Sequence, residues 1–187
     1  MKPPLAVALL HHPVYDKNGQ VVTTAITNLD LHDIARAART FGVDRYYLVT
    51  PAPEQQALAQ KIVGHWQVGY GGTYNPQRKA ALALVKLAAT LDEAVTDLTD
   101  RCGMPPLLVA TGAHHRPGSL TSGELRQRLQ REERPGLLLF GTGWGLADEV
   151  FARVDLVLEP IAGADDFNHL SVRSAVAIIL DRLLGSR

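Results

Sequence analysis

Three glycines alternate in the stretch GTGWGL, at Gly141, Gly143 and Gly145, directly after the apolar run Leu137–Phe140. A glycine-rich turn after a strand lets backbone amides come close to a ligand, because no side chain keeps the ligand away. The spacing differs from the dinucleotide-binding pattern G-x-G-x-x-G, and Leu146 stands where a phosphate-binding P-loop has its lysine. The stretch is therefore either a ligand-binding loop of another kind or a tight turn whose glycines only supply positive φ angles.

Two further loops of small residues follow apolar runs. Thr111 and Gly112 come directly after one run, and Gly163 lies in the segment LEPIAGADDFNHLSV after another. Because the carboxyl ends of parallel strands meet at one edge of a sheet, the three loops could form one pocket of backbone groups. A pocket without a fixed positive charge suits a neutral or zwitterionic adenosine-bearing ligand better than a polyphosphate.

Two histidine pairs, His11-His12 and His114-His115, also follow apolar runs. Adjacent residues on an extended segment point in opposite directions, so at most one histidine of each pair could face a common point. No cysteine or paired carboxylate stands at a matching spacing for a metal ligand. We therefore expect no metal site.

The composition limits the classes of protein that fit. With 187 residues, 46% of them hydrophobic and 20% charged, the chain is typical of one soluble globular domain, expected over residues 1–187. The net charge is zero, so a nucleic-acid partner would need a local basic surface. The single cysteine excludes an internal disulfide, and no apolar run is long enough to span a membrane. We expect a cytoplasmic protein.

Strand-like and helix-like patterns alternate along the whole chain. The predicted strands cover residues 5–10, 46–50, 84–88, 107–111, 137–140 and 156–158. This alternation predicts an α/β fold with a mostly parallel sheet and helices on both of its faces. The glycine-rich segment Gly64–Pro76 is predicted to be a long irregular loop.

Capping residues and apolar spacing mark the helices. Thr90 with Glu93 predicts a capping box at the start of a helix, and Thr121 or Ser122 is predicted to cap the next one. The last predicted helix, over residues 170–184, is apolar around most of its circumference. Such a helix is expected to be buried against the sheet, a partner subunit or both.

Three segments, in order along the chain, match motifs of a known family. They are NLDLHDIARAARTFGV (28–43), LLLFGTGWGLADEV (137–150) and VDLVLEPIAGADDFNHLSVRSAVAIIL (154–180). These segments resemble the three motifs of the SPOUT superfamily of RNA methyltransferases, which depend on S-adenosylmethionine (SAM). The chain as a whole is similar to a small family related to the catalytic domain of tRNA (guanine-1) methyltransferase. The resemblance implies a C-terminal trefoil knot, a homodimer and SAM bound in the knot.

The resemblance also implies roles for single residues. Arg36 falls where the ribose-methylating branch has its catalytic arginine, and Asp30 stands in place of an asparagine of that branch. Asp165 and Asp166 lie where guanine-methylating relatives have an aspartate that could accept a proton from a guanine ring nitrogen. Without the resemblance, Arg36 would be a surface arginine paired with Asp33, and the two aspartates a helix-capping feature. The implied SAM contacts are Thr111, Gly112, Gly141, Thr142, Gly143, Ile161, Gly163, Leu170 and Ser171.

We therefore expect the chain to transfer a methyl group from SAM to a tRNA or rRNA, with a guanine ring nitrogen as the favoured acceptor. Ribose 2′-O-methylation is the alternative reaction. A non-catalytic module that binds SAM and RNA is the alternative class of protein, and a test for transfer of a labelled methyl group to RNA separates it from an enzyme.

Overall fold

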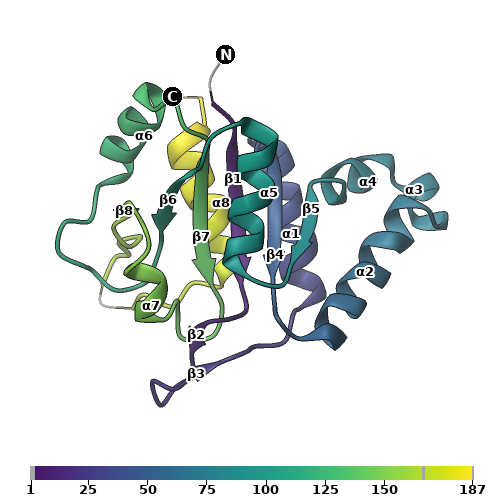
Figure 1. Ribbon diagram of the computed structural model, residues 1–187, viewed down its shortest axis with the longest axis horizontal. Coiled ribbons are helices and arrows are strands. Elements are labelled where there is room, and N and C mark those ends of the chain that lie inside the picture. Colours follow the sequence, from purple (N-terminus) through teal and green to yellow (C-terminus); the bar gives the residue numbers. More distant parts are fainter. Residues whose placement is uncertain (1–2, 166, 187) are drawn as a thin grey trace.

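Six parallel strands form the centre of the molecule in the computed structural model, which describes residues 3–165 and 167–186 (Figure 1). Every neighbouring pair in this sheet is parallel, in the order β5-β4-β1-β7-β6-β8. The predicted α/β class and parallel sheet are thus confirmed, and each strand lies within one residue of its expected bounds. These are β1 (Leu5–Leu10), β4 (Arg45–Val49), β5 (Val85–Ala88), β6 (Leu107–Ala110), β7 (Gly136–Gly141) and β8 (Leu156–Val157).

Helices cover both faces of the sheet, as predicted. On one face Val7 and Leu9 of β1 pack in a core with residues of α1 (Asn28–Thr40), α6 (Ser122–Arg131) and α8 (Val172–Leu184). On the other face Ala6, Ala8 and Leu10 pack in a second core with residues of α5 (Leu91–Cys102) and α7 (Asp148–Phe151). The period-two alternation along β1 therefore separates the two cores.

Side-chain caps fix several helix starts. Thr121 caps α6 in a complete capping box with Glu124, which decides between Thr121 and Ser122. Thr90 caps α5 as predicted, accepting a hydrogen bond from the amide of Glu93 at 3.2 Å. The Glu93 carboxylate, however, accepts from the amide of Ala89 at 2.7 Å, one residue before the cap, so the expected box is only half formed.

The apolar C-terminal helix α8 is buried within one chain. Its residues Val176, Ile179, Leu180 and Leu183 are buried in the core that α1 and α6 share. The expectation that α8 is buried against the sheet is thus confirmed. Much of its apolar surface is covered without a second subunit. Along residues 3–165 and 167–186, no helix combines the length and the apolarity needed to cross a membrane.

The expected loop over Gly64–Pro76 is wrong. Helix α2 (Pro53–Gln67) continues into this segment, α3 (Tyr70–Tyr74) follows at once, and α4 (Pro76–Leu82) begins at its end. The glycines serve close packing: a Cβ atom at Gly72 would lie 2.4 Å from the carbonyl oxygen of Trp66. Glycine is a turn former in many loops, but here it allows α3 to touch α2.

A two-stranded hairpin projects from the carboxyl end of the sheet. Strands β2 (Val14–Tyr15) and β3 (Val21–Val22) pair antiparallel, and Gly19 has a φ of 75° in the connecting turn. The Asp16 carboxylate accepts hydrogen bonds from the amides of Asn18 and Gln20, both at 2.8 Å. The hairpin places Tyr15 beside the glycine loop.

Candidate active site

Three loops leave adjacent strands at the carboxyl edge of the sheet. Strands β7, β6 and β8 are neighbours in this order, so the loops that follow them are also neighbours (Figure 1). These loops carry all nine residues expected to bind SAM. The sheet topology therefore brings together segments that lie up to sixty residues apart in the chain, as a parallel α/β sheet does at its ligand site. Below, the loop over 141–147 is called the glycine loop.

The glycine loop is held against the hairpin by backbone hydrogen bonds. The amide of Trp144 donates to the Tyr15 carbonyl at 2.9 Å, and the Tyr15 amide donates to the Gly145 carbonyl at 2.9 Å. Gly143 has a φ of 59° and Gly145 a φ of 104°, values that L side chains rarely adopt. Thr142 anchors the start of the loop, since both its amide and its hydroxyl donate to the Leu10 carbonyl at 3.2 Å.

Replacement of Gly143 by valine should destabilise the fold. A Cβ atom at this position would lie 2.8 Å from the Tyr15 carbonyl oxygen, and the positive φ adds strain. We expect Gly143→Val to lower the free energy of unfolding by roughly 1–3 kcal/mol, measured by urea titration. An unchanged free energy of unfolding would show that the loop accommodates a side chain, so that this glycine would serve only a ligand.

The loops after β6 and β8 are joined to each other. Leu120 at the end of the β6 loop forms a parallel bridge with Leu158, and the Asn168 side chain donates to the Ala113 carbonyl at 2.9 Å. Thr111 is buried, and its hydroxyl donates to the Leu139 carbonyl of β7 at 2.9 Å. The backbone of this side of the site is therefore fixed by contacts within the chain.

Of the four glycines expected to bind SAM, Gly112 is the one where an added side chain would meet no close contact. It is exposed, and a Cβ atom there would meet only the Phe151 ring, at an ordinary 3.7 Å. The nearby cation, Arg116, lies over the Phe151 ring and pairs with Asp148 at 2.6 Å. The loops therefore offer backbone groups and a neutralised arginine, which suits a zwitterionic ligand such as SAM better than a polyphosphate.

The remaining SAM-site residues lie between β8 and the start of α8. Ile161 packs against the core, Gly163 and Leu170 are exposed, and Ser171 caps α8 by accepting from the Ser174 amide at 3.3 Å. These four residues form the third side of the site.

The two candidate proton acceptors differ in what can be described. Asp165 is exposed, and its carboxylate accepts a hydrogen bond from the Phe167 amide at 2.9 Å. This contact closes a local turn and does not cap a helix, since Ser171 caps α8. Asp166 lies outside the described residues.

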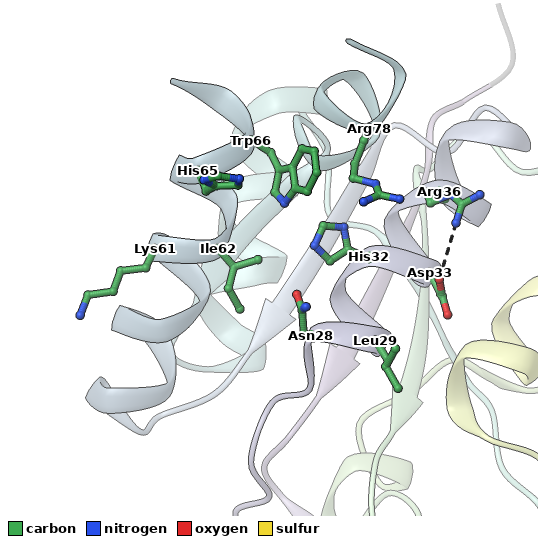
Figure 2. Close-up of a pocket in the computed structure, with 10 residues that line it drawn as sticks. All are labelled: Asn28, Leu29, His32, Asp33, Arg36, Lys61, Ile62, His65, Trp66 and Arg78. Atoms are coloured by element: carbon green, nitrogen blue, oxygen red, sulfur yellow. Dashed lines mark ion pairs between the residues drawn. The ribbon is translucent and has the colours of Figure 1, made fainter. Parts of the chain in front are cut away.

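Asp30 and Arg36 lie on α1, away from the glycine loop. Asp30 is buried, accepts from the Thr27 hydroxyl at 2.6 Å and pairs with Arg173 of α8 at 3.4 Å. It therefore joins the starts of α1 and α8. Arg36 is exposed and lies 3.9 Å from Asp33, the surface pair expected without the resemblance. Figure 2 shows this pair at one end of a cleft between α1 and α2.

A buried histidine supports the glycine loop from below. The Nδ1 atom of His11 lies 3.0 Å from the Thr24 hydroxyl, which in turn contacts the Thr142 hydroxyl. Burial lowers the pKa of His11 from 6.5 to about 4, although the charge of Asp30 opposes this shift. His11 is therefore neutral at physiological pH. In the sequence it is recognisable only as a member of a histidine pair.

Acidification should destabilise the protein through His11. Between pH 6.5 and about pH 4 the unfolded chain binds a proton that the folded chain does not, so stability is full above pH 6.5 and falls as the pH falls. We expect a loss of roughly 2–3 kcal/mol between pH 7 and pH 4.5 from this group. Urea titrations of wild type and His11→Gln measure it, and an equal pH dependence in both would contradict the assignment.

Metal ligands do not gather in the part of the chain that the structure describes: it contains no group of three His, Cys, Asp or Glu side chains that could hold a metal ion.

The fold matches that of solved methyltransferase structures. A solved structure of TrmJ from Z. mobilis ZM4 superposes with a TM-score of 0.62 at 18% identity, over 99% of this chain and 69% of that one. Residues 4–185 match a family described as SAM-dependent RNA methyltransferase. The chain belongs to this family, and it is therefore an enzyme that uses SAM as methyl donor.

Two relatives are nearly half identical to this chain over the residues that align. An uncharacterised protein from Aquifex aeolicus is 45% identical over 95% of this chain and 86% of its own length. A tRNA (guanine-N(1)-)-methyltransferase from Oleidesulfovibrio alaskensis is 46% identical over 97% of this chain. The match spans only 42% of the length of the latter protein.

Proposed function

We propose that this enzyme methylates a tRNA at N1 of a guanine. The observation that carries the proposal is the 46% identity, over 97% of the chain, to a protein named tRNA (guanine-N(1)-)-methyltransferase. The chain corresponds to 42% of that protein, so the remaining part of the relative has no counterpart in this match.

In this proposal SAM lies among the loops after β6, β7 and β8, and supplies a methyl group activated by its positively charged sulfur. The site's contribution is to hold the donor and acceptor in line at a near-attack distance. The exposed side of Gly112 and the backbone of the glycine loop would face the donor. Trp144, which is 62% exposed beside them, could shield the donor from water.

The acceptor nitrogen must lose its proton as the new N–C bond forms and the S–C bond breaks. Asp165 is an exposed carboxylate on the third loop, and its position allows contact with an RNA base. We propose that it accepts the N1 proton. Arg36 would then stabilise negative charge that develops on the base or lies on a neighbouring phosphate.

Ribose 2′-O-methylation is the alternative reaction, favoured by the position of Arg36 in the first motif. Asp30, which replaces the asparagine of that motif, is buried and engaged with Thr27 and Arg173. An aspartate carboxylate that is held by these two partners is not free to accept the proton of a ribose hydroxyl. This contact therefore supports a base acceptor.

We further propose a homodimer and a C-terminal trefoil knot. Two exposed leucines support the dimer: Leu29 at the start of α1 is 59% exposed and Leu170 just before α8 is 45% exposed. The Asp30–Arg173 ion pair joins these two helix starts, so both leucines lie in the same region. A second subunit would cover them, and sedimentation at micromolar concentration would detect it.

Mass spectrometry of nucleosides tests the proposed reaction. Total tRNA from a strain that lacks the gene is incubated with the protein and SAM carrying an isotopically labelled methyl group. We expect labelled 1-methylguanosine, and an Asp165→Asn variant should form much less of it at equal SAM affinity. A label on a ribose oxygen, or on a base other than guanine, would overturn the proposal.

A further inference from the structure

A cleft of about 580 Å³ lies between α1, α2 and α4, apart from the loops of the SAM site (Figure 2). Asn28, His32 and Arg36 are spaced by four residues on α1 and so share one face of that helix. Lys61 and His65 have the same spacing on α2. We call this the α1–α2 cleft. Trp66 lies in the glycine-rich segment Gly64–Pro76, to which the proposed methyl transfer assigns no role.

Arg78, at the start of α4, is positioned in the cleft by stacking. Its guanidinium carbon lies 4.8 Å from the centre of the Trp66 ring, and the His32 ring meets the same tryptophan edge-on at 5.5 Å. The Arg78 Nε atom and the His32 Nδ1 atom are both buried without a hydrogen-bond partner in the described part of the chain. Buried polar atoms of this kind normally have a partner.

Positive charge exceeds negative charge in the cleft. Arg36, Lys61 and Arg78 line it, whereas Asp33 is its only acidic lining residue. Lys61 and Arg78 form no ion pair with any residue from 3–165 or 167–186. A chain with zero net charge therefore concentrates unpaired cations at one place, and an anion is the ligand they would attract.

The cations are spread across the cleft. In Figure 2 Lys61 stands at one end, Arg36 at the other, and Arg78 with Trp66 and His32 between them. Such a row follows an extended polyanion better than it surrounds one compact phosphate.

Aromatic side chains adjoin the cleft. Tyr70 and Tyr74 of α3 are stacked on each other, with ring centres 6.3 Å apart, and are 77% and 75% exposed. Helix α3 touches the cleft directly, since a Cβ atom at Gly71 would lie 2.7 Å from the His65 ring. Exposed aromatic rings beside a basic groove are typical of surfaces that bind unpaired nucleotides.

We propose that the α1–α2 cleft binds the sugar-phosphate backbone of the RNA substrate, with the Arg78 guanidinium contacting a phosphate. Trp66 holds this guanidinium in place, and Lys61 contacts a flanking phosphate. The proposal rests on the proposed function in taking RNA as the substrate. It adds a contact surface that lies outside the SAM-binding loops.

Salt-dependent binding of bulk tRNA tests the cleft. We expect Arg78→Ala to weaken tRNA binding by ~10-fold at low salt, the usual scale for a charged hydrogen bond. The slope of log K against log salt should fall by roughly 0.7–0.9, corresponding to one lost phosphate contact. Arg131→Ala is the matched control, because Arg131 is exposed on α6 at the opposite end of the sheet (Figure 1).

Two further variants guard against an effect on folding. Arg78→Lys keeps the charge but loses the planar fork, so it should keep most of the salt slope and lose part of the affinity. Lys61→Glu changes an exposed side chain and should also reduce both affinity and slope. If Arg78→Ala and Lys61→Glu both bind tRNA with the affinity and slope of Arg131→Ala, the proposal is overturned.

Inorganic phosphate separates RNA from a small anionic ligand. If phosphate raises the unfolding temperature of wild type but not of Arg78→Ala, while tRNA affinity is equal in both, the cleft serves a free phosphate compound and the RNA assignment is overturned. Loss of tRNA binding in Arg78→Ala together with absence of labelled 1-methylguanosine in the wild-type reaction would support the cleft and refute the proposed reaction.

Discussion

Arg36→Ala should lower the single-turnover rate of methyl transfer at saturating RNA by at least ~100-fold, the scale for losing one group that stabilises charge in the transition state. The Arg36 side chain is 61% exposed, and its ion pair with Asp33 spans 3.9 Å. An exposed pair of this length contributes little to stability, so the variant should stay folded. Rapid-quench measurement of labelled methyl transfer gives the rate.

The same variant should bind SAM normally, because the ion pair that Arg36 forms in the described part of the chain is with Asp33 of the same helix and not with a SAM-site loop. Arg36→Lys should restore little activity if the planar fork matters. Arg39→Ala, three residues further along α1 and equally exposed, provides the matched control. A wild-type rate in Arg36→Ala would make this arginine a surface residue, and a loss of SAM affinity would bring α1 into the donor site.

Gly112→Val should remove most SAM binding while the fold stays intact. The added side chain meets only the Phe151 ring, at 3.7 Å from its Cβ atom, so the protein itself has room for it. The space it enters is the space proposed for the donor. Forcing extra methyl groups into a filled site costs about 1–3 kcal/mol, which corresponds to a ~5- to 150-fold weaker affinity in calorimetric titration.

Gly123→Val is the control for this substitution. Gly123 lies at the start of α6, and a Cβ atom there meets only the Thr121 hydroxyl at 3.9 Å. Both variants should unfold at nearly the wild-type urea concentration, and only Gly112→Val should lose SAM. Undiminished SAM affinity in Gly112→Val would exclude the loop after β6 from the donor site.

The strands and the helices α5, α6 and α8 were predictable because their signals are local. Apolar runs such as Leu5–Leu10 have the length of buried strands, and Thr121 with Glu124 carries the signature of a capping box. The order of the strands was not predictable from the chain, since it depends on which crossovers pack best. That order is what makes the loops after β7, β6 and β8 neighbours.

Two features were missed although the sequence contained signals for them. Pro53 stands at the first turn of α2, a position that favours a helix start. Asn18-Gly19 is a typical hairpin turn between β2 and β3. The glycines at 71 and 72 misled because glycine is used both in turns and where two helices touch, and only the packing partner, Trp66, distinguishes the two uses.

The candidate site was predictable as a set of loops but not as a set of contacts. Thr142 is expected from the motif, whereas the link from its hydroxyl through Thr24 to His11 joins residues more than a hundred positions apart. The ion pair of Asp30 also joins distant residues, because Arg173 comes from the far end of the chain. Arg78 and Trp66 likewise meet only through the packing of α4 against α2.

The hydrogen bonds between the glycine loop and the hairpin tie the motions of the two segments together. The amides of Tyr15, Trp144 and Ala147 donate across this boundary at 2.9 Å, 2.9 Å and 3.1 Å. None of them can exchange its hydrogen with solvent until the loop and the hairpin separate, so all three should report one common free energy of opening. A methyl donor that contacts only the glycine loop should therefore slow hydrogen exchange at Tyr15 as much as at Trp144, although Tyr15 lies outside the three SAM-site loops.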